Sequence, residues 1–329
     1  MFFKYGGKML SVKTVNILKR ITLAVGLALS FCSINYGSAT RVFTCGGIRI
    51  CPICPSSGLT PDEADAIARS WGVDVSRYIT GSSEDQVFAD PIKKFHLLDD
   101  ALRSNADVVW AVRGGYGLDK VMPMVIGKHY PNRKIIIGYS DSSSLLIYMS
   151  QRHGWQAING PSLKEMALGS KSLKSRNAIM DFLEGRVTTL RLNGLVPINA
   201  AANTAGALFG KVTGGNLTCV VSGIGAPWCV WTDGRILFLE DTNVDGYRLD
   251  RLLAHLKHAG LLNGVVAIVF GNFGGGSTKK VLKNFANQLK IPVYQTLQFG
   301  HENENMPIGY EFHGTIMRVH NEYELTMRQ

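Results

Sequence analysis

The sequence contains no apolar stretch of the roughly 18 residues that a membrane-spanning helix needs. No internal repeat and no low-complexity segment appears either. Of the 329 residues, 46% are hydrophobic and 18% are charged, which is typical of a globular protein and argues against a disordered one. A chain of this length has room for two domains, each with its own core.

A basic stripe interleaved with aromatic residues, the pattern of a nucleic-acid-binding surface, is also missing. Residues 1–39 carry five basic side chains and no acidic one, so they contribute half of the formal net charge of +10. The remaining 30 basic and 25 acidic residues are dispersed and leave a net charge of +5. This balance gives no case for nucleic acid, and we expect none among the partners.

The first 39 residues have the anatomy of a secretory signal. Basic residues at positions 13, 19 and 20 precede an apolar run from Ile21 to Phe31, and Gly37-Ser38-Ala39 supplies small residues for cleavage. A noncleaved anchor or a misplaced start codon is the alternative interpretation. We expect residues 1–39 to be a signal peptide, and the mature chain to have no stable membrane insertion.

A set of metal ligands with sensible spacing is absent. Cys51-Pro52-Ile53-Cys54 has the C-x-x-C spacing of redox or half-zinc sites, but no second close pair exists and no histidine lies within zinc-finger distance. Small buried residues at the end of a first strand are therefore the preferred interpretation. In an exported chain Cys219 and Cys229 are candidates for a disulfide, which the sequence alone does not decide. We expect neither a metal nor a cofactor.

Strand-like apolar runs alternate with helical patterns in the first half of the chain. Strands are predicted at residues 49–53, 107–112 and 134–137, and helices at 60–71 and 90–103. Thr60 and Glu63 form a capping box at the start of the first helix. This alternation predicts a parallel sheet covered by helices, with the chemistry at the carboxyl ends of the strands.

The second half has a more mixed pattern. Strands are predicted at residues 189–198, 210–213, 235–239 and 264–270, and helices at 249–259 and 278–289. The expected α/β architecture has three parts after the signal: an N-terminal parallel-sheet domain at residues 40–165, a linker with a bridging helix at 166–199, and a smaller mixed α/β domain at 200–329.

The segment Gly138-Tyr139-Ser140-Asp141-Ser142 follows a predicted strand and precedes an apolar helical run. A serine on such a turn is where a nucleophile elbow places its hydroxyl, beside the N–H groups and positive potential of a helix N-terminus. The segment is not a G-x-S-x-G, because Ser142 stands at the position of the second glycine. From spacing alone, Ser140 is a candidate nucleophile or an N-capping serine.

A second glycine-containing loop, Arg113-Gly114-Gly115-Tyr116-Gly117, also follows a predicted strand. Paired glycines allow the backbone to approach a ligand closely and to adopt positive φ. The loop lacks the Lys-Ser/Thr of a P-loop and the spacing of a dinucleotide fingerprint. An oxyanion donor, a carboxylate clamp through Arg113 and a plain tight turn remain open interpretations.

Two further candidates stand at the ends of strands in the second half. Glu240 and Asp241 follow the strand at 235–239, where a carboxylate serves catalysis or caps the next helix. His301 lies in a polar loop after an apolar strand, a position where most histidines are simply solvated. Neither residue identifies a function by itself.

Taken together, the motifs resemble the LD-carboxypeptidase family of serine peptidases, which includes the microcin-immunity peptidases. The resemblance runs from about Ile48 to Val319. Its marks, in order, are Pro55-Ser56-Ser57, Arg113-Gly114-Gly115-Tyr116-Gly117, Gly138-Tyr139-Ser140-Asp141, Gly214-Gly215-Asn216-Leu217, Leu237-Phe238-Leu239-Glu240-Asp241, and Gly300-His301 with Pro307-Ile308-Gly309. This chain departs from the family at Asn159-Gly160-Pro161, where a His-Gly-Pro is common.

The resemblance implies a triad in which Ser140 is the nucleophile, His301 the general base and Glu240 the residue that orients the histidine. It further implies an oxyanion hole formed by the N–H groups of Gly115 and Asp141. Substrate contacts are expected from Arg113, Tyr116 and Asn216. In the family the serine lies in the N-terminal domain and the other two residues in the C-terminal domain, so the active site is expected between them.

The family reaction cuts the amide between an L-centre, of meso-diaminopimelate or lysine, and the terminal D-alanine of muropeptides. The expected partners are a tetrapeptide muropeptide substrate and, since family members are commonly homodimers, a second copy of the chain. The signal implies a periplasmic enzyme; the alternative is the cytoplasm.

Two other functions are weighed against the carboxypeptidase. One keeps the triad and cleaves a microcin-type peptidyl or aminoacyl nucleotide, with Trp228 or Trp231 stacking on the base. The other is an inactive relative that binds muropeptides, which the three filled triad positions disfavour. A nucleotide-binding regulator lacks both an acidic ribose-binding residue and a P-loop lysine.

Overall fold

The structure is a computed structural model that describes residues 2–5, 8–11, 42–80 and 90–329. Most of the predicted signal peptide therefore lies outside the described residues. Its described parts are the short strands β1 (Phe2–Tyr5) and β2 (Lys8–Ser11). Within the part that the structure describes, no helix has the length and apolar character needed to cross a membrane.

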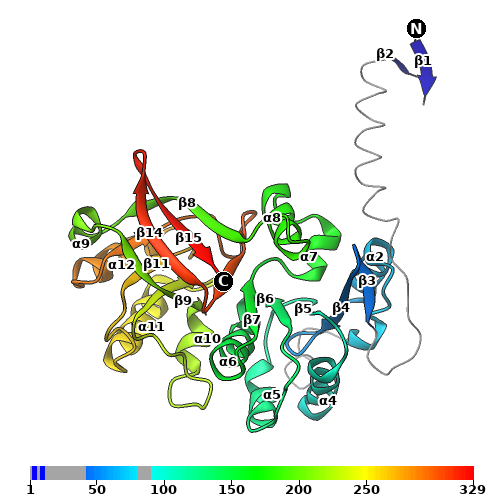
Figure 1. Cartoon of the computed structure of the whole chain (residues 1–329), viewed down its shortest axis with the longest axis horizontal. Coiled ribbons are helices and arrows are strands. Elements are labelled where there is room, and N and C mark those ends of the chain that lie inside the picture. The colour runs from blue at the N-terminus through cyan, green and yellow to red at the C-terminus, as the bar shows by residue number, and fades with distance from the viewer. Residues whose placement is uncertain (1, 6–7, 12–41, 81–89) are drawn as a thin grey trace.

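A six-stranded sheet, built mostly by the first half of the chain, has the order β13-β7-β6-β5-β4-β3, and Figure 1 labels its strands β3 to β7. Its strands are β3 (Phe43–Cys45), β4 (Ile48–Ile53), β5 (Val108–Ala111), β6 (Ile135–Gly138), β7 (Gln156–Asn159) and β13 (Ile308–Tyr310). The four central strands run parallel and only the two edge strands pair antiparallel. The predicted parallel sheet is thus confirmed.

Among the helices that connect these strands, the two predicted at residues 60–71 and 90–103 are present. The elements are α2 (Pro61–Trp71), η1 (Ser76–Tyr78), α4 (Pro91–Arg103), α5 (Leu118–Val125), η2 (Ser140–Ser142) and α6 (Ser143–His153). Thr60 accepts a hydrogen bond from the N–H of Glu63, and the Glu63 carboxylate accepts one from the N–H of Thr60. The predicted capping box is therefore present, and the side chain of Asp90 caps α4 by accepting a hydrogen bond from the N–H of Ile92.

The second half folds into a closed, seven-stranded mixed barrel in the order β10-β11-β12-β8-β15-β14-β9. Its strands are β8 (Thr189–Pro197), β9 (Leu208–Asn216), β10 (Arg235–Glu240), β11 (Ala267–Phe270), β12 (Val293–Gln295), β14 (His313–Val319) and β15 (Glu322–Arg328). Strands β9 to β12 pair in parallel and the others antiparallel. The helices are α9 (Ala200–Thr204), α10 (Leu217–Ser222), α11 (Gly246–His258) and α12 (Ser277–Asn287).

Two strands tie the halves together more closely than the predicted organisation implies. The expected linker contains α7 (Leu163–Leu168) and α8 (Leu173–Leu183), but also β8, which is a barrel strand with alternating buried leucines. Strand β13 returns from the end of the chain to pair with β7 of the first sheet. Its residue Tyr310 packs its ring 5.2 Å from that of Phe238 in the barrel core. The two halves consequently share a continuous apolar core.

Candidate active site

The turn between β6 and α6 has the conformation of a nucleophile elbow. Ser140 has a φ of 60°, a left-handed value that costs a non-glycine residue about 1–3 kcal/mol. The chain fits because residue 138 is a glycine: a Cβ there would lie 2.9 Å from Cβ of Ser142 and 3.0 Å from Cβ of Ala111. The turn leaves Ser140 partly exposed while Asp141 and Ser142 are buried. A strained, sharply turned serine is the local structure that presents a hydroxyl for reaction.

Ser140, His301 and Glu240 form one hydrogen-bonded series. Nε2 of His301 lies 3.0 Å from Oγ of Ser140, and Nδ1 lies 2.7 Å from Oε2 of Glu240. Ser140 follows the carboxyl end of β6, Glu240 ends β10, and His301 stands in the loop after β12. The structure therefore brings together the three residues that the resemblance names, from both halves of the chain.

The electrostatics of the pair suit a general base. Glu240 has no exposed surface, whereas the side chain of His301 keeps 22% of its surface exposed. Burial disfavours the charged imidazolium, but the hydrogen bond and the negative charge of Glu240 outweigh it, and the pKa of His301 is raised above its usual 6.5. A carboxylate at Nδ1 also fixes the tautomer that leaves Nε2 free to accept a proton.

Asn216 supports Glu240 from the neighbouring strand. The two residues are paired in the parallel register of β9 and β10. Nδ2 of Asn216 donates to Oε1 of Glu240 at 3.2 Å and to Oδ1 of Asp241 at 2.9 Å, and its Oδ1 accepts the N–H of Cys219. Asn216 is also buried. Both amide donors are thus directed at carboxylates, an arrangement that favours a role for Asn216 in orienting Glu240, while its predicted substrate contact stays a prediction.

The glycine loop lies directly against the serine. A Cβ on Gly114 would lie 2.9 Å from Cβ of Ser140, and one on Gly115, whose φ is 115°, would lie 2.1 Å from Oγ of Ser57. Among the described residues, no backbone hydrogen bond outside the helices and strands uses the N–H of Gly115 or of Asp141. This is compatible with their predicted role as oxyanion donors, which stays a prediction.

The side chain of Asp141 joins the serine turn to the glycine loop. Its Oδ2 accepts the N–H of Leu118, the first residue of α5, at 3.0 Å. The cap residue of that helix is Gly117, which has no side chain to do this. Burial raises the pKa of Asp141 to about 6, although the nearby hydroxyl of Ser56 and the hydrogen bond from the N–H of Leu118 oppose the rise.

Arg113 and Tyr116, the other expected substrate contacts, have different surroundings. Nη1 of Arg113 donates to the carbonyl of Gly58 at 3.0 Å and to Oε2 of Glu63 at 3.1 Å. The ring of Tyr116 is 51% exposed, with Nζ of Lys120 5.3 Å from its centroid. Neither contact tests the predicted role, which stays a prediction.

Trp231, a candidate for stacking on a nucleobase, is occupied by the protein itself. The guanidinium of Arg152 lies 3.5 Å from the centroid of its ring, and the backbone N–H of Trp231 donates a hydrogen bond to Oε1 of Gln151. Gln151 and Arg152 belong to the last turn of α6, whereas Ser140 precedes its first turn. Trp231 therefore lies at the far end of this helix from the serine.

Asn159, at which the sequence departs from the family, lies in the protein interior next to the loop that carries His301. It has no exposed surface, and its Nδ2 lies 3.5 Å from Oδ1 of Asn305. The same oxygen of Asn305 accepts the N–H of Gly300, the residue before His301. Asn159 thus contacts the loop of His301 from the interior of the protein. Sequence reasoning missed Asn305, because an asparagine in a polar loop carries no pattern.

The cysteines are free thiols in the described residues. Burial raises the pKa of Cys51 to about 11 and of Cys54 to about 12, which makes both thiols inert, in keeping with the expected buried role. Cys219 is not bonded to Cys229; its Sγ lies 3.6 Å from the carbonyl oxygen of Ser140. Over the part of the chain that the structure describes, no three His, Cys, Asp or Glu residues gather as metal ligands.

Comparison with known families matches both halves of the chain. The model of the LD-carboxypeptidase N-terminal domain matches residues 50–160, and that of the C-terminal domain matches residues 209–316. A Rickettsia conorii protein that carries a provisional carboxypeptidase name is 36% identical over 94% of this chain and 99% of its own length. The murein tetrapeptide carboxypeptidase of Pseudomonas aeruginosa is 28% identical over 78% of this chain and 89% of its own length.

Solved structures share the fold. The muramoyltetrapeptide carboxypeptidase of Oxalobacter formigenes superposes with a TM-score of 0.70 at 23% identity, covering 85% of this chain and 98% of that one. A protein from Streptococcus pneumoniae that resembles the microcin C7 self-immunity protein, solved with AMP, gives a TM-score of 0.69 at 15% identity. It covers 84% of this chain and 97% of its own.

Proposed function

The chain belongs to the LD-carboxypeptidase family, and from this membership we propose that it is a serine carboxypeptidase that releases the terminal D-alanine from peptidoglycan tetrapeptides. The observation that carries the proposal is the unbroken series from Oγ of Ser140 through the imidazole of His301 to the buried carboxylate of Glu240. A serine hydroxyl is a weak nucleophile until such a base accepts its proton.

The proposed reaction has two halves. In the first, Oγ of Ser140 attacks the carbonyl carbon of the L,D amide while Nε2 of His301 takes the hydroxyl proton. The N–H groups of Gly115 and Asp141 stabilise the negative oxygen of the tetrahedral intermediate. When the intermediate collapses, the C–N bond breaks, His301 returns the proton to the leaving amine, and D-alanine departs from an acyl-Ser140 ester. Water, deprotonated by His301, then hydrolyses the ester.

Substrate recognition is proposed to involve the loop that carries Arg113 and Tyr116. Among the described residues, the hydrogen bonds of Arg113 use Nη1, so its Nη2 keeps donors for a carboxylate such as that of terminal D-alanine. The names of two relatives support the substrate class: one is a murein tetrapeptide carboxypeptidase and another a probable murein peptide carboxypeptidase, from Bacillus subtilis. The position of Trp231 gives no support to a nucleotide substrate.

The test is incubation of the purified protein with a disaccharide tetrapeptide, followed by mass spectrometry. Loss of one alanine residue by the wild type, and no loss by a folded Ser140→Ala variant, is the expected result. An intact tetrapeptide after incubation with folded wild type contradicts the proposal and directs attention to peptidyl nucleotides and to muropeptide binding without cleavage.

Two further expectations remain proposals of this work. We propose that the chain is exported to the periplasm, on the basis of the signal pattern at residues 1–39. We also propose that the exported protein forms a homodimer, on the basis of the family resemblance. Fractionation of cells that express the full chain should recover a product shortened near Ala39 outside the cytoplasm. Sedimentation of that product should give twice the monomer mass. A full-length cytoplasmic product overturns the first expectation, and a monomer the second.

A further inference from the structure

A buried lysine lies behind the loop of the catalytic histidine. Lys171, between α7 and α8, exposes only 2% of its side chain. Its Nζ donates to three successive carbonyls of the loop: to Gly300 at 3.4 Å, to His301 at 2.7 Å, and to Glu302. Burial of an ammonium group is unfavourable unless such bonds and a countercharge accompany it. The hydrogen bonds to these carbonyls therefore fix the position of Lys171 and, at the same time, bind the loop of His301 to it.

Glu165 supplies the countercharge and connects the lysine to the serine turn. Oε1 of Glu165 lies 3.5 Å from Nζ of Lys171 and accepts a hydrogen bond of 2.5 Å from the hydroxyl of Tyr139. Its other oxygen, Oε2, is held by the N–H of Ser162 in the capping box of α7. Tyr139 directly precedes Ser140. A continuous series of contacts thus leads from the nucleophile's neighbour to the backbone of the base.

The residues that follow Lys171 bind the rest of the loop that carries His301. The N–H of Ser172 donates to the carbonyl of Asn303 at 2.8 Å, and the N–H of Asn305 donates to Oγ of Ser175 at 2.9 Å. The ring of Tyr139 lies 5.0 Å from the ring of His301, and Nζ of Lys171 lies 5.5 Å from the Tyr139 centroid. The loop is consequently seated on Tyr139 and on the linker residues 171–175.

We propose that Lys171 and Glu165 are positioning residues, which set the separation between Oγ of Ser140 and Nε2 of His301. The inference rests on the proposed function, since only a serine nucleophile needs that separation. Ser140 belongs to the first sheet and His301 to the barrel side, so their 3.0 Å contact depends on a link between the two halves. A displacement of about 1 Å in such a pair costs on the order of 100-fold in rate.

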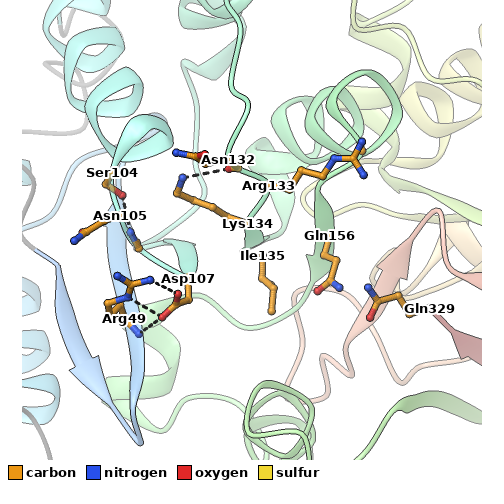
Figure 2. Close-up of a pocket in the computed structure, with 12 residues that line it drawn as sticks. Arg49, Ser104, Asn105, Asp107, Asn132, Arg133, Lys134, Ile135, Gln156 and Gln329 are labelled. Carbon is orange, nitrogen blue, oxygen red and sulfur yellow. Dashed lines mark hydrogen bonds and ion pairs between the residues drawn. The ribbon is translucent and has the colours of Figure 1, made fainter.

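The chain contains a matched control for a substitution of Lys171. Lys134 is also buried, at 6% exposure, and its Nζ donates to the carbonyls of Leu102 at 3.1 Å and Asn132 at 3.3 Å. Its Nζ likewise lies near an aromatic ring, 5.2 Å from that of Trp155. Figure 2 shows Lys134 in a pocket with Arg49 and Asp107, at the amino ends of the strands. Lys134 thus resembles Lys171 in its burial and in its carbonyl and aromatic contacts, but lies at the end of β6 opposite to Ser140.

The experiment compares Lys171→Met with Lys134→Met in the full chain. The first readout is the rate at which an alkyl fluorophosphonate labels Ser140, measured from pH 5 to 9; the second is kcat and KM for D-alanine release. We expect both variants to melt at lower temperature, but only Lys171→Met to lower the high-pH plateau of labelling and kcat, each by about 100-fold, with KM unchanged. Equal plateaus in the two variants overturn the inference.

The outcomes separate the inference from the proposed function. A wild type that is labelled at Ser140 but releases no D-alanine refutes the proposed substrate, and the labelling rates still decide on Lys171. A folded wild type that is not labelled overturns both, because no activated pair then exists to be positioned. If Lys171→Met does not fold, Tyr139→Phe removes only the hydroxyl that Glu165 accepts, and Tyr130→Phe, whose hydroxyl donates to Asp99, is its control. A labelling plateau in Tyr139→Phe equal to that of Tyr130→Phe then overturns the inference.

Discussion

Gly114 and Ser140 are in such close contact that a Cβ on the glycine would lie 2.9 Å from Cβ of the serine. Real side chains essentially never approach that closely, so the loop of Gly114 and the serine turn fit together only because one of them has no side chain. The contact sets the distance between the nucleophile and the N–H of Gly115. The glycine is therefore a part of the candidate active site that contributes no functional group.

Gly114→Ala should lower kcat for D-alanine release by about 10- to 100-fold, because the new methyl group pushes the loop from Ser140 and displaces an oxyanion donor. The control is Gly206→Ala, since a Cβ on Gly206 meets nothing within 4 Å. Neither glycine has a left-handed φ, so backbone strain does not confuse the comparison. Steady-state kinetics check the prediction, and equal kcat values in the two variants contradict it.

Glu240→Gln should lower kcat by at least about 100-fold while the protein still folds. A glutamine keeps the shape but neither fixes the correct tautomer of His301 nor stabilises the imidazolium. The wild-type profile of kcat/KM should have its acidic limb above pH 6.5, because the pKa of His301 is raised and the base works only when deprotonated. In the variant the limb should move to lower pH. A limb at the same pH in both proteins refutes the role of Glu240.

Asn216→Ala should lower kcat by about tenfold or more and leave KM almost unchanged. The substitution removes one hydrogen bond from each of two buried carboxylates, Glu240 and Asp241. It should therefore also lower the free energy of unfolding by about 1–3 kcal/mol. A substrate contact by Asn216 would instead appear as a raised KM. The split between kcat and KM therefore decides which of the two roles the residue has.

Asp141→Asn should stabilise the protein at pH 8, with a gain that disappears below about pH 4. The folded pKa of about 6 lies above the usual 3.8, so the fold favours the protonated carboxyl. Its ionisation costs stability as the pH rises from 3.8 to 6, and the full cost applies above pH 6. An asparagine still accepts the N–H of Leu118 but does not ionise. Melting temperatures of both proteins across this range check the prediction; a difference independent of pH contradicts it.

Elements with local signals could be predicted from the sequence. Thr60 and Glu63 reveal the start of α2 because both partners of a capping box lie within one turn. Strand β13 could not be found in this way, since three residues carry no periodicity and its pairing with β7 joins residues that are 149 to 153 positions apart in the sequence. Long-range pairing is decided by packing, which a local pattern does not contain.

The residues of the candidate site likewise include some that the sequence identified and some that it did not. Ser140, Glu240 and His301 could be named because each stands in a recognisable motif, and the order of the motifs pointed to one family. The direction of the Asn216 amide could not, because its motif gives the position of the backbone and not the partner of the side chain. Lys171 escaped altogether: a lysine in a polar segment indicates a solvated charge, and only the fold shows that carbonyls surround it.

The return of β13 to the first sheet has a consequence for the order in which the protein is made. When a growing chain has emerged as far as Leu289, it contains β3 to β7, Ser140 and Glu240, but β7 still has an open edge and the serine has no base. Ile308 to Tyr310 close that edge, and they follow His301 by only a few residues. Completion of the first sheet and arrival of His301, the proposed general base, are thus one event, late in synthesis, so that a truncated product has neither a finished sheet nor a complete set of the proposed catalytic residues.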